Sequence, residues 1–471
     1  PNLTTWSTKR WVERMADRLP DESRVANWVV FARPDWTQTE LGRLCHPVRT
    51  PNVGMKEKQV LSLSYGRVVV KPAAKMRGLL PASFETYQVL RPGDIVIRPT
   101  DLQNDQNSLR VGQANDYGII TSAYISLRPT SGVSDRYLFQ LLRSYDFMKV
   151  FYGFGSGLRQ NLEFKHIRRI PAALPGHVEQ QLIVRYIDNA EMRIARAIQA
   201  KQHMLTLLAE RRAVLTETWL LRGGPNTDRE VKPESPQLGS TPRAWGTIAC
   251  RYLFREVTRH DLSPDDPKLS LSLSRGLVRS SELSSKSATE SDRLSYKRCE
   301  PGDIVLNKYR AYLGAFSAAA ERGRITPNYT VLAPRTDLPS AYFAQLFATP
   351  TFQGIWRRQS YGVGDGMMPL YTSNFYPIRS LLPSQSEATR VLTGLDRDAV
   401  TIDSAMQSVE REIALLREYR TRLISDVVTG KKDVRAEASG MKDVDPAELA
   451  AVLAGSVAAE DYELGENDDA E

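Results

Sequence analysis

The sequence has few cysteines and histidines, and their spacing forms no recognisable site. Cys45, Cys250 and Cys299 are odd in number and far apart, and the five histidines form no metal-ligand pattern. We therefore expect neither a disulfide framework nor a zinc site. No apolar run approaches the roughly 20 residues that cross a bilayer, and residues 1–6 contain no apolar signal segment. These absences favour a cytoplasmic protein, and 471 residues of ordinary composition predict more than one hydrophobic core.

Motifs for catalysis are also missing. The sequence has no phosphate-binding G-x-x-x-x-G-K-[ST] loop and no Pro-Pro dipeptide of the kind that grips an extruded DNA base. Residues 151–155 match the F-x-G-x-G pattern used to approach S-adenosylmethionine, but they follow a helical pattern, and Gly155-Ser-Gly157 recurs as Gly364-Asp-Gly366. Fragments of a nuclease metal motif at residues 163–165 and 263–268 are expected by chance. We interpret the chain as having no catalytic or metal site.

The net charge of +8 hides an asymmetry. Residues 436–471 contain eleven acidic side chains and one basic one, Lys442, which gives −10 for this segment and leaves +18 for residues 1–435. A strongly basic body suggests a polyanionic partner, most simply nucleic acid. Because ribosomal and membrane-surface proteins share such a charge, composition alone leaves those classes open.

What the sequence does contain is an internal duplication with an offset near 208 residues. Residues 61–64 match 271–274, Pro92-Gly-Asp-Ile-Val96 matches Pro301-Gly-Asp-Ile-Val305, and the helical pattern at Tyr137 matches the one at Tyr342. The order of the matches never changes. A period this long excludes solenoids and propellers and indicates tandem duplication of a whole domain.

Each repeat begins with short β-like runs separated by Pro and Gly and interrupted by one or two short helices. We predict an α/β (α+β) domain with a curved, largely antiparallel sheet, followed by a long helix. The predicted organisation is an N-terminal helical arm (1–27), α/β domain 1 (28–176), long helix 1 (177–223), a Gly/Pro-rich linker (224–242), α/β domain 2 (243–383), long helix 2 (384–430), and an acidic tail (431–471) expected to be disordered apart from a short helix at 446–459.

Both long helices carry apolar residues in alternating steps of four and three, the seam of a coiled coil. Charged residues interrupt the seam at Lys201, Arg211, Asp398 and Glu412, and a glycine ends each helix. We predict an antiparallel pair about 65 Å long; the alternative is that each helix packs on its own domain. The seam residues are Ile183, Ile187, Ile194, Leu208 and Leu215 in the first helix and Val391, Leu395, Ile402, Leu416 and Leu423 in the second.

Basic, amide and aromatic side chains gather near predicted loops of both domains. Arg, Asn and Gln make bidentate contacts with base edges, whereas Lys and scattered Arg neutralise phosphates. The candidate DNA-contacting residues are Lys71, Lys75, Arg77, Arg98, Arg110, Arg159, Gln160 and Asn161 in the first domain, and Lys308, Tyr309, Arg310, Tyr312, Arg324, Asn328, Arg357, Arg358 and Gln359 in the second.

Together these features resemble the DNA specificity subunit of type I restriction-modification systems. The resemblance covers residues 28–432: each domain opens with Pro and Trp, contains Pro-Gly-Asp-Ile-Val, and passes through Leu-Pro into a helix containing Leu-Leu-x-Glu-x-Arg. It implies two target-recognition domains that each read half of a split double-stranded DNA sequence. It also implies that the helices dock two methyltransferase subunits, which use S-adenosylmethionine, and that restriction subunits, which use ATP and Mg, join them. The chain itself would hold no cofactor and catalyse nothing.

Two other hypotheses remain open. The chain could be a self-contained DNA methyltransferase or nuclease, which binding of S-adenosylmethionine by the purified chain would support. It could instead be a coiled-coil adaptor that does not bind DNA, and the absence of a salt-sensitive gel shift would favour that hypothesis.

The helix length generates a testable prediction about the spacing of the two half-sites. Inserting four residues after Gln199 lengthens that helix by about 6 Å, which is close to two base-pair steps of about 3.4 Å. The insertion is near one helical turn, so it perturbs the seam without inverting it. We expect the altered complex to methylate the same half-sites with a spacer one or two base pairs longer. An unchanged spacer at full activity would show that the separation is set elsewhere.

Overall fold

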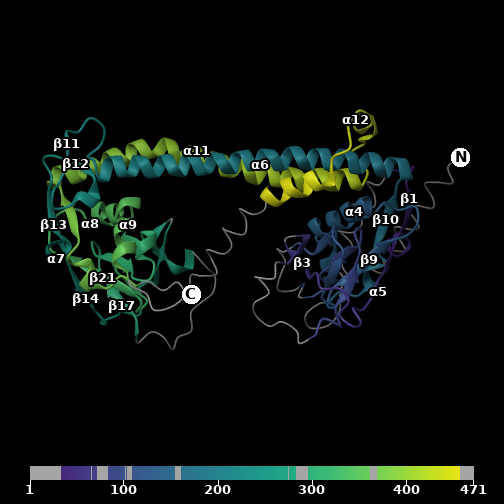
Figure 1. Ribbon diagram of the computed structural model, residues 1–471, viewed down its shortest axis with the longest axis horizontal. Coiled ribbons are helices and arrows are strands. Elements are labelled where there is room, and N and C mark those ends of the chain that lie inside the picture. The colour runs from purple at the N-terminus through teal and green to yellow at the C-terminus, as the bar shows by residue number, and fades with distance from the viewer. Residues whose placement is uncertain are drawn as a thin grey trace. The chain divides into compact units, whose positions relative to one another are not determined.

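The computed structural model describes residues 33–64, 66–71, 83–100, 102, 109–153, 161–273, 275–282, 295–360 and 369–456 (Figure 1). The chain divides into two compact units, which we call unit 1 (Pro1–Gln202 with Arg411–Glu471) and unit 2 (His203–Glu410). The helical arm predicted for residues 1–27 lies outside the described residues. None of the described helices combines the length and apolarity needed to cross a membrane.

Unit 1 is built on a four-stranded antiparallel sheet with the strand order β2-β9-β6-β7. Strand β6 is buried along its whole length because its Ile-Val-Ile sequence suits a strand covered on both faces. Three antiparallel pairs, β1–β10, β3–β4 and β5–β8, complete the strands. The elements are β1 (Thr37–Glu40), α3 (Leu41–Leu44), β2 (Cys45–Pro47), β3 (Leu61–Ser64), β4 (Arg67–Val70), β5 (Gln88–Leu90), β6 (Ile95–Ile97), β7 (Val111–Gln113), β8 (Gly118–Ile120), β9 (Ile125–Pro129), α4 (Asp135–Phe147), η2 (Val150–Gly153), α5 (Phe164–Ile167) and β10 (Pro171–Leu174).

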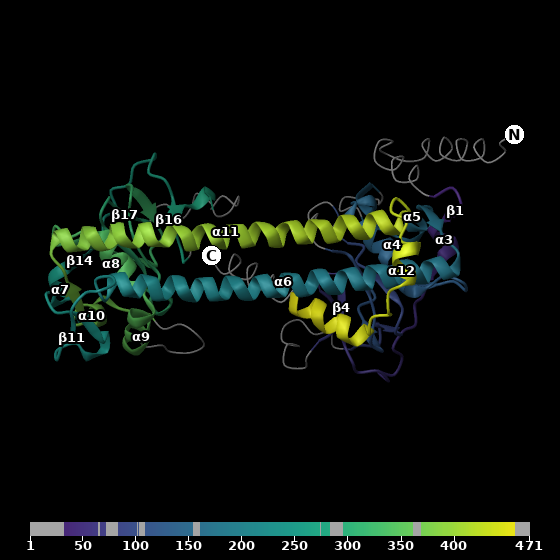
Figure 2. The same cartoon turned by 90° about the horizontal axis from the view of Figure 1, so that it is seen from above.

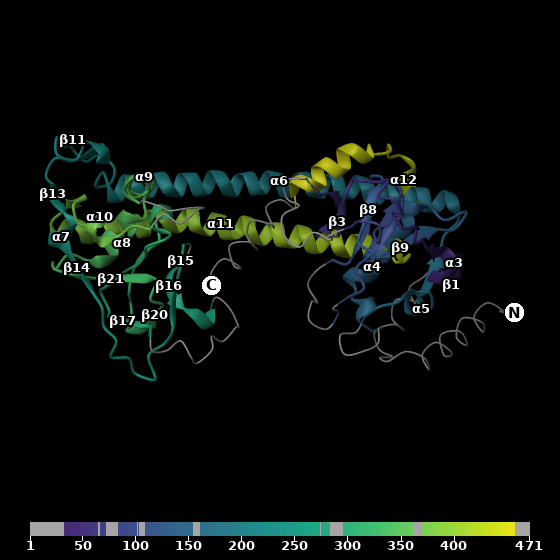
Figure 3. The ribbon, with the colours of Figure 1, turned by 60° about the horizontal axis from the view of Figure 1, so that its bottom comes forward.

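Unit 2 repeats this arrangement with the order β14-β21-β18-β19, and Figure 3 shows β15 with β16 and β17 with β20 beside that sheet. The predicted mixed α/β fold with antiparallel sheets is therefore confirmed in both units. The elements are β11 (Arg229–Val231), η3 (Pro236–Leu238), β12 (Ser240–Pro242), β13 (Gly246–Ala249), α7 (Cys250–Leu253), β14 (Phe254–Val257), β15 (Leu269–Ser272), β16 (Gly276–Arg279), η4 (Ser280–Glu282), β17 (Lys297–Cys299), β18 (Ile304–Asn307), η6 (Ala311–Leu313), β19 (Phe316–Ala318), β20 (Gly323–Ile325), β21 (Tyr329–Pro334), α8 (Ser340–Phe347), α9 (Pro350–Gln359), α10 (Thr372–Phe375) and β22 (Arg379–Leu382).

One detail of the predicted duplication is wrong. The strand that corresponds to β3 in unit 2 is β15, Leu269–Ser272, and not residues 271–274. The error arises because the Leu-Ser alternation continues beyond the strand into the hairpin loop, so the sequence offers two equally good registers.

The long helices are α6 (His177–Leu220) and α11 (Gln385–Val428), each of 44 residues. Helix α11 begins with a capping box, in which the Ser384 hydroxyl accepts the Glu387 amide and the Glu387 carboxylate accepts the Ser384 amide. Both helices are followed by a glycine of positive φ, Gly223 at 70° and Gly430 at 78°, as their sequences predict. A short helix, α12 (Arg435–Ser439), follows α11.

Within each unit α6 and α11 run side by side and antiparallel (Figure 2). The ion pair of Lys201 with Glu412 in unit 1 joins two of the charged residues that interrupt the apolar seam. In unit 2 the indole Nε1 of Trp219 donates to Asp398 over 3.0 Å, so a third charged residue of the seam also has a partner. The predicted pairing is therefore confirmed within each unit. Of the seam residues, Ile183, Ile187, Ile194, Val391, Leu395, Ile402 and Leu423 are buried, and Leu208, Leu215 and Leu416 are partly buried.

A charged network distinguishes the attachment of the first domain to these helices from that of the second. In unit 1, α4 meets α6 through charge: Arg136 pairs with Asp188 at 2.7 Å, and Arg143 pairs with Glu191 at 2.7 Å. Burial raises the pKa of the Glu191 carboxyl, but Arg143 and Arg136 outweigh burial and hold that pKa below its usual range. The corresponding residues of unit 2 are Ala341, Asp396, Ala348 and Ala399.

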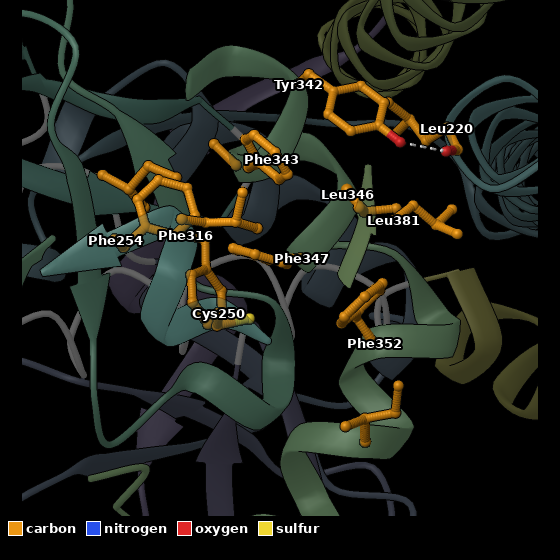
Figure 4. Close-up of a cluster of buried hydrophobic side chains, with 14 of the residues drawn as sticks. Leu220, Cys250, Phe254, Phe316, Tyr342, Phe343, Leu346, Phe347, Phe352 and Leu381 are labelled. Carbon is orange, nitrogen blue, oxygen red and sulfur yellow. Dashed lines mark hydrogen bonds between the residues drawn. The ribbon is translucent and has the colours of Figure 1, made fainter. Parts of the chain in front are cut away.

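In unit 2 the attachment is apolar and aromatic (Figure 4). A single buried cluster contains Trp219 and Leu220 of α6, Val391 and Leu395 of α11, and most of the core of the domain. The Tyr342 hydroxyl donates to the backbone carbonyl of Leu220 over 3.0 Å, so the ring is both packed and oriented. This domain is consequently held by shape complementarity more than by charge.

The predicted disorder of the tail is wrong for residues 431–445, which the structure describes. Helix α12 and a further helix over residues 446–456 are described, and they pack on α6. Their order depends on tertiary contacts, such as the ion pair of Asp443 with Arg185 at 2.6 Å, which the local composition does not reveal. The short helix predicted at 446–459 is confirmed up to residue 456, and residues 457–471 lie outside the described residues.

The crossing of α6 and α11 in unit 2 depends on Gly394, and this gives a stability prediction. A Cβ atom at Gly394 would lie 2.4 Å from the ring of Trp219. We expect Gly394→Ala to lower the free energy of unfolding by about 1 to 3 kcal/mol because the buried indole must move. The control is Gly354→Ala in α9, where a Cβ atom would lie 3.7 Å from the flexible Arg358 guanidinium. That change should be neutral or stabilise by up to about 1 kcal/mol. Denaturant unfolding of both variants measures the difference, and equal effects would contradict the prediction.

Candidate nucleic-acid interface

The repeated Pro-Gly-Asp motif sets the direction of the central strand in each sheet. Gly93 and Gly302 have φ of 93° and 88°, which only glycine adopts without strain. The buried Asp94 accepts the Arg91 amide over 2.9 Å and binds Arg128 through two bonds of 2.8 Å. Gly93 and Asp94 are therefore turn residues that lead into a strand.

Asp303 does the same in unit 2. Its carboxylate accepts the Glu300 amide over 2.8 Å and pairs with Arg259 at 2.5 Å. The charged motif therefore stabilises the entrance of each strand and is not exposed for binding. The predicted contact residues Arg98 and Lys308 instead follow the opposite, carboxyl end of the strand.

These loops are tied down in the same way in both units. The Leu162 amide donates to the Pro99 carbonyl over 2.9 Å, and the Leu370 amide donates to the Lys308 carbonyl over 2.8 Å. Each bond fixes the first residues after the central strand by means of a segment far along the chain. The first residue or two after each central strand are thus held in place by the fold itself.

In unit 2 the loop after β18 carries basic and aromatic side chains. Lys308, Tyr309, Arg310 and Tyr312 are all half-buried, and the Lys308 ammonium lies 5.1 Å from the centre of the Tyr309 ring. Tyr371 follows the tying residue Leu370 and is 53% exposed. Sequence reasoning missed Tyr371, because only the Leu370–Lys308 bond reveals that it is near this loop.

The strand register brings a further predicted residue to the same end of the sheet. Asn307 at the end of β18 is paired with Tyr329 at the start of β21, so the exposed Asn328 lies at the same edge as Lys308. Helix α9, which ends with the exposed Arg357 and Arg358, packs against η6 immediately after the loop. Gln359 is half-buried, and Arg324 lies within β20 opposite Arg298.

The first domain shows fewer of its predicted residues. Lys71 follows β4 and is half-buried, Arg98 follows β6 and is half-buried, and Asn161 is exposed. The other predicted residues of this domain, apart from Arg110, lie outside the described residues: Lys75, Arg77, Arg159 and Gln160.

The structure contradicts the prediction that Arg110 contacts DNA. Its side chain is completely buried, and its guanidinium donates to the Thr100 carbonyl over 2.6 Å and to the Tyr152 hydroxyl over 2.9 Å. The Asp146 carboxylate accepts the Arg110 backbone amide over 2.6 Å. Arg110 therefore organises the interior beside β7 and cannot reach a ligand.

The described residues offer no evident catalytic centre. Among the residues described, no group of three or more His, Cys, Asp or Glu side chains could hold a metal ion. All three cysteines are buried, and burial raises the pKa of the Cys45 thiol to about 12 and that of the Cys299 thiol to about 11. Thiols of such high pKa are poor nucleophiles.

The fold of this chain is similar to that of a protein of known structure. No family model and no curated protein matches the chain. A chain of a solved structure, described as the "structural basis underlying complex assembly and conformational transition of the type I R-M system", matches with a TM-score of 0.56 at 14% identity, covering 85% of this chain and 99% of that one. The HsdS subunit from Thermoanaerobacter tengcongensis gives a TM-score of 0.40 at 14% identity, covering 85% and 98%. The type I restriction-modification S subunit from M. genitalium gives 0.29 at 12%, covering 83% and 96%. On the first of these matches, the chain has the fold of a component of the type I restriction-modification system.

Proposed function

We propose that this chain is the DNA specificity subunit of a type I restriction-modification complex. The observation that carries the proposal is a duplicated α/β domain, each copy followed by a 44-residue helix, in a chain that shares the fold of that system. Each domain would read one half of a split double-stranded sequence. Methyltransferase subunits would supply S-adenosylmethionine chemistry, and restriction subunits would supply ATP and Mg. This chain would contribute recognition alone.

The charge and the loop chemistry support DNA as the ligand. Residues 1–435 carry +18, which favours a polyanion, and counterion release would make the affinity salt-dependent. In unit 2, Lys308 and Arg310 stand beside Tyr309 and Tyr371 at one end of the sheet. Such loops can combine phosphate contacts from Lys with bidentate base contacts from Arg.

Exposed apolar residues on the long helices support partner docking. On α6, Met204, Leu207 and Val214 are 46%, 51% and 65% exposed, and their spacing places them along one side of the helix. On α11, Leu415 and Tyr419 are 63% and 54% exposed, and they lie one helical turn apart. Large apolar side chains gathered on an exposed surface mark protein interaction sites, so these residues are candidates for binding methyltransferase subunits.

A domain exchange tests whether each domain reads its own half-site. Residues 30–174 are replaced by the equivalent domain of a related subunit, the chain is co-expressed with the neighbouring methyltransferase gene, and methylated adenines are mapped genome-wide. We expect one half of the methylated motif to change while the other half is unaltered. Exchange of residues 243–383 is the matched control and should change only the other half. If both halves change in either exchange, independent recognition is wrong; if no motif depends on the chain, the specificity function is wrong.

A pair of substitutions tests the loop of unit 2. We expect Lys308→Ala with Arg310→Ala to weaken DNA binding at an unchanged melting temperature. A lost base contact costs about 1 to 3 kcal/mol, and a lost phosphate contact makes the salt dependence shallower. Gel shifts at several salt concentrations measure both effects.

The matched control removes the same charge at the other end of the same sheet. Arg335 is exposed after the far end of β21, and Arg251 is exposed in the adjacent α7. Arg251→Ala with Arg335→Ala should bind DNA nearly as the unaltered chain does. An equal loss in both double variants would mean that net charge alone was measured, and a large fall in melting temperature with DNA binding retained would assign Lys308 and Arg310 to the fold.

A further inference from the structure

The segment of residues 441–456 lies along α6 and is held there by side chains of that helix (Figure 2). The contacts include ion pairs to its side chains and hydrogen bonds to its backbone carbonyls, so the backbone of the segment is held along its length. They are Arg185 to Asp443 at 2.6 Å, Asn189 to the Lys442 carbonyl at 2.9 Å, Arg196 to Glu448 at 2.5 Å, Gln199 to the Val452 carbonyl at 2.7 Å, and Gln202 to the Ser456 carbonyl at 3.4 Å.

Two buried apolar residues, Met192 and Leu449, lie among these polar contacts. Residues 185, 189, 192, 196 and 199 share one side of α6 by helical spacing, opposite the seam residues Ile187 and Ile194. Met192, in the middle of that side, is 6% exposed, and Leu449 of the segment is 3% exposed. The segment therefore covers a surface of α6 that neither the seam nor the sheet of unit 1 uses.

Within the part of the chain that the structure describes, the second repeat has no such cover. A shift of 208 residues takes this side of α6 to Thr393, Arg397, Val400, Ser404 and Gln407 of α11, all of which are exposed. Val400, the counterpart of Met192, is 61% exposed. The C-terminal segment is thus an addition to one repeat and not part of the duplicated fold.

The segment also contacts the first domain. The guanidinium of Arg67, in strand β4, donates to the Ala450 carbonyl over 3.3 Å. Burial lowers the pKa of Arg67, which agrees with a side chain enclosed between two elements. Arg67 belongs to the β3–β4 hairpin and precedes Lys71, a candidate DNA contact, by four residues.

We propose that residues 441–456 form a brace that positions the β3–β4 hairpin on α6, and that recognition by the first domain, but not by the second, depends on this brace. The proposal rests on the proposed function of the chain in DNA recognition. Its physical basis is pre-organisation: a hairpin fixed before binding does not have to be ordered by the DNA, so less of the contact energy is lost on association. Leu449 and Arg67 are positioning residues in this scheme and need not touch DNA.

The test uses the full chain in its complex and duplexes in which one half-site is scrambled. We expect Leu449→Asp to weaken binding of the complete site by about tenfold, to reduce discrimination against a scrambled first half-site, and to leave discrimination of the second half-site unchanged. Leu449→Met should restore the behaviour of the unaltered chain. Ala447→Asp, which introduces the same charge at an exposed position of the same helix, is the matched control and should have no effect.

A second measurement does not depend on DNA. We expect hydrogen exchange of residues 61–70 to become faster in Leu449→Asp and in Arg67→Ala, while exchange in strands β15 and β16 of unit 2 is unchanged. Unchanged exchange in the β3–β4 hairpin would overturn the brace. Equal loss of discrimination at both half-sites would also overturn it, because the segment would then support the whole chain. If the unaltered chain discriminates neither half-site, the proposed function fails instead, and the exchange measurement still decides whether the brace exists.

Discussion

The fold depends on the need of two long helices to bury an apolar stripe that no single domain covers. Each helix has 44 residues, and its buried seam residues include Ile187 on α6 and Val391 on α11, both completely buried. Burial of each such side chain contributes about 1.5 to 3 kcal/mol. Within each unit the two helices bury this stripe by antiparallel pairing (Figure 2). The polar residues within the stripe then find one another, as Lys201 and Glu412 do.

The contacts between domain and helices include a buried charged network in unit 1 and an aromatic cluster in unit 2, and the two kinds of contact differ in their geometric requirements. A buried network such as Arg143–Glu191 gains little net stability over apolar packing, but it is demanding in geometry, because a buried carboxylate without its partner is costly. The aromatic attachment around Tyr342 tolerates small displacements more easily, since dispersion and area burial are less directional. The attachment of the first domain thus includes geometrically demanding charged contacts, to which the C-terminal segment adds more.

The duplicated architecture could be predicted from the sequence because it rests on repeated local patterns. Predicted helices at 177–223 and 384–430 agree closely with His177–Leu220 and Gln385–Val428. The interface residues were harder to predict, because exposure depends on partners distant in the sequence. In the sequence Arg110 looks like an exposed basic residue of a loop. In the structure it is buried, because its guanidinium donates hydrogen bonds to the Thr100 carbonyl and the Tyr152 hydroxyl. The order of residues 431–445 was missed for the same reason, because Lys442 and Asp443 find their partners on α6.

The boundary between the two compact units falls inside the helices, between residues 202 and 203 of α6 and between 410 and 411 of α11. Each domain therefore packs with the first half of the helix that follows it and with the last half of the other helix. A domain and the helix segments that pack with it are therefore not encoded by one continuous stretch of the gene, because unit 1 combines two separate segments of the chain. Recombination that breaks the gene in the middle of each helix carries a domain away together with the side chains that anchor it. Recombination at the domain edges places a new domain against helix side chains that were selected to contact the previous domain.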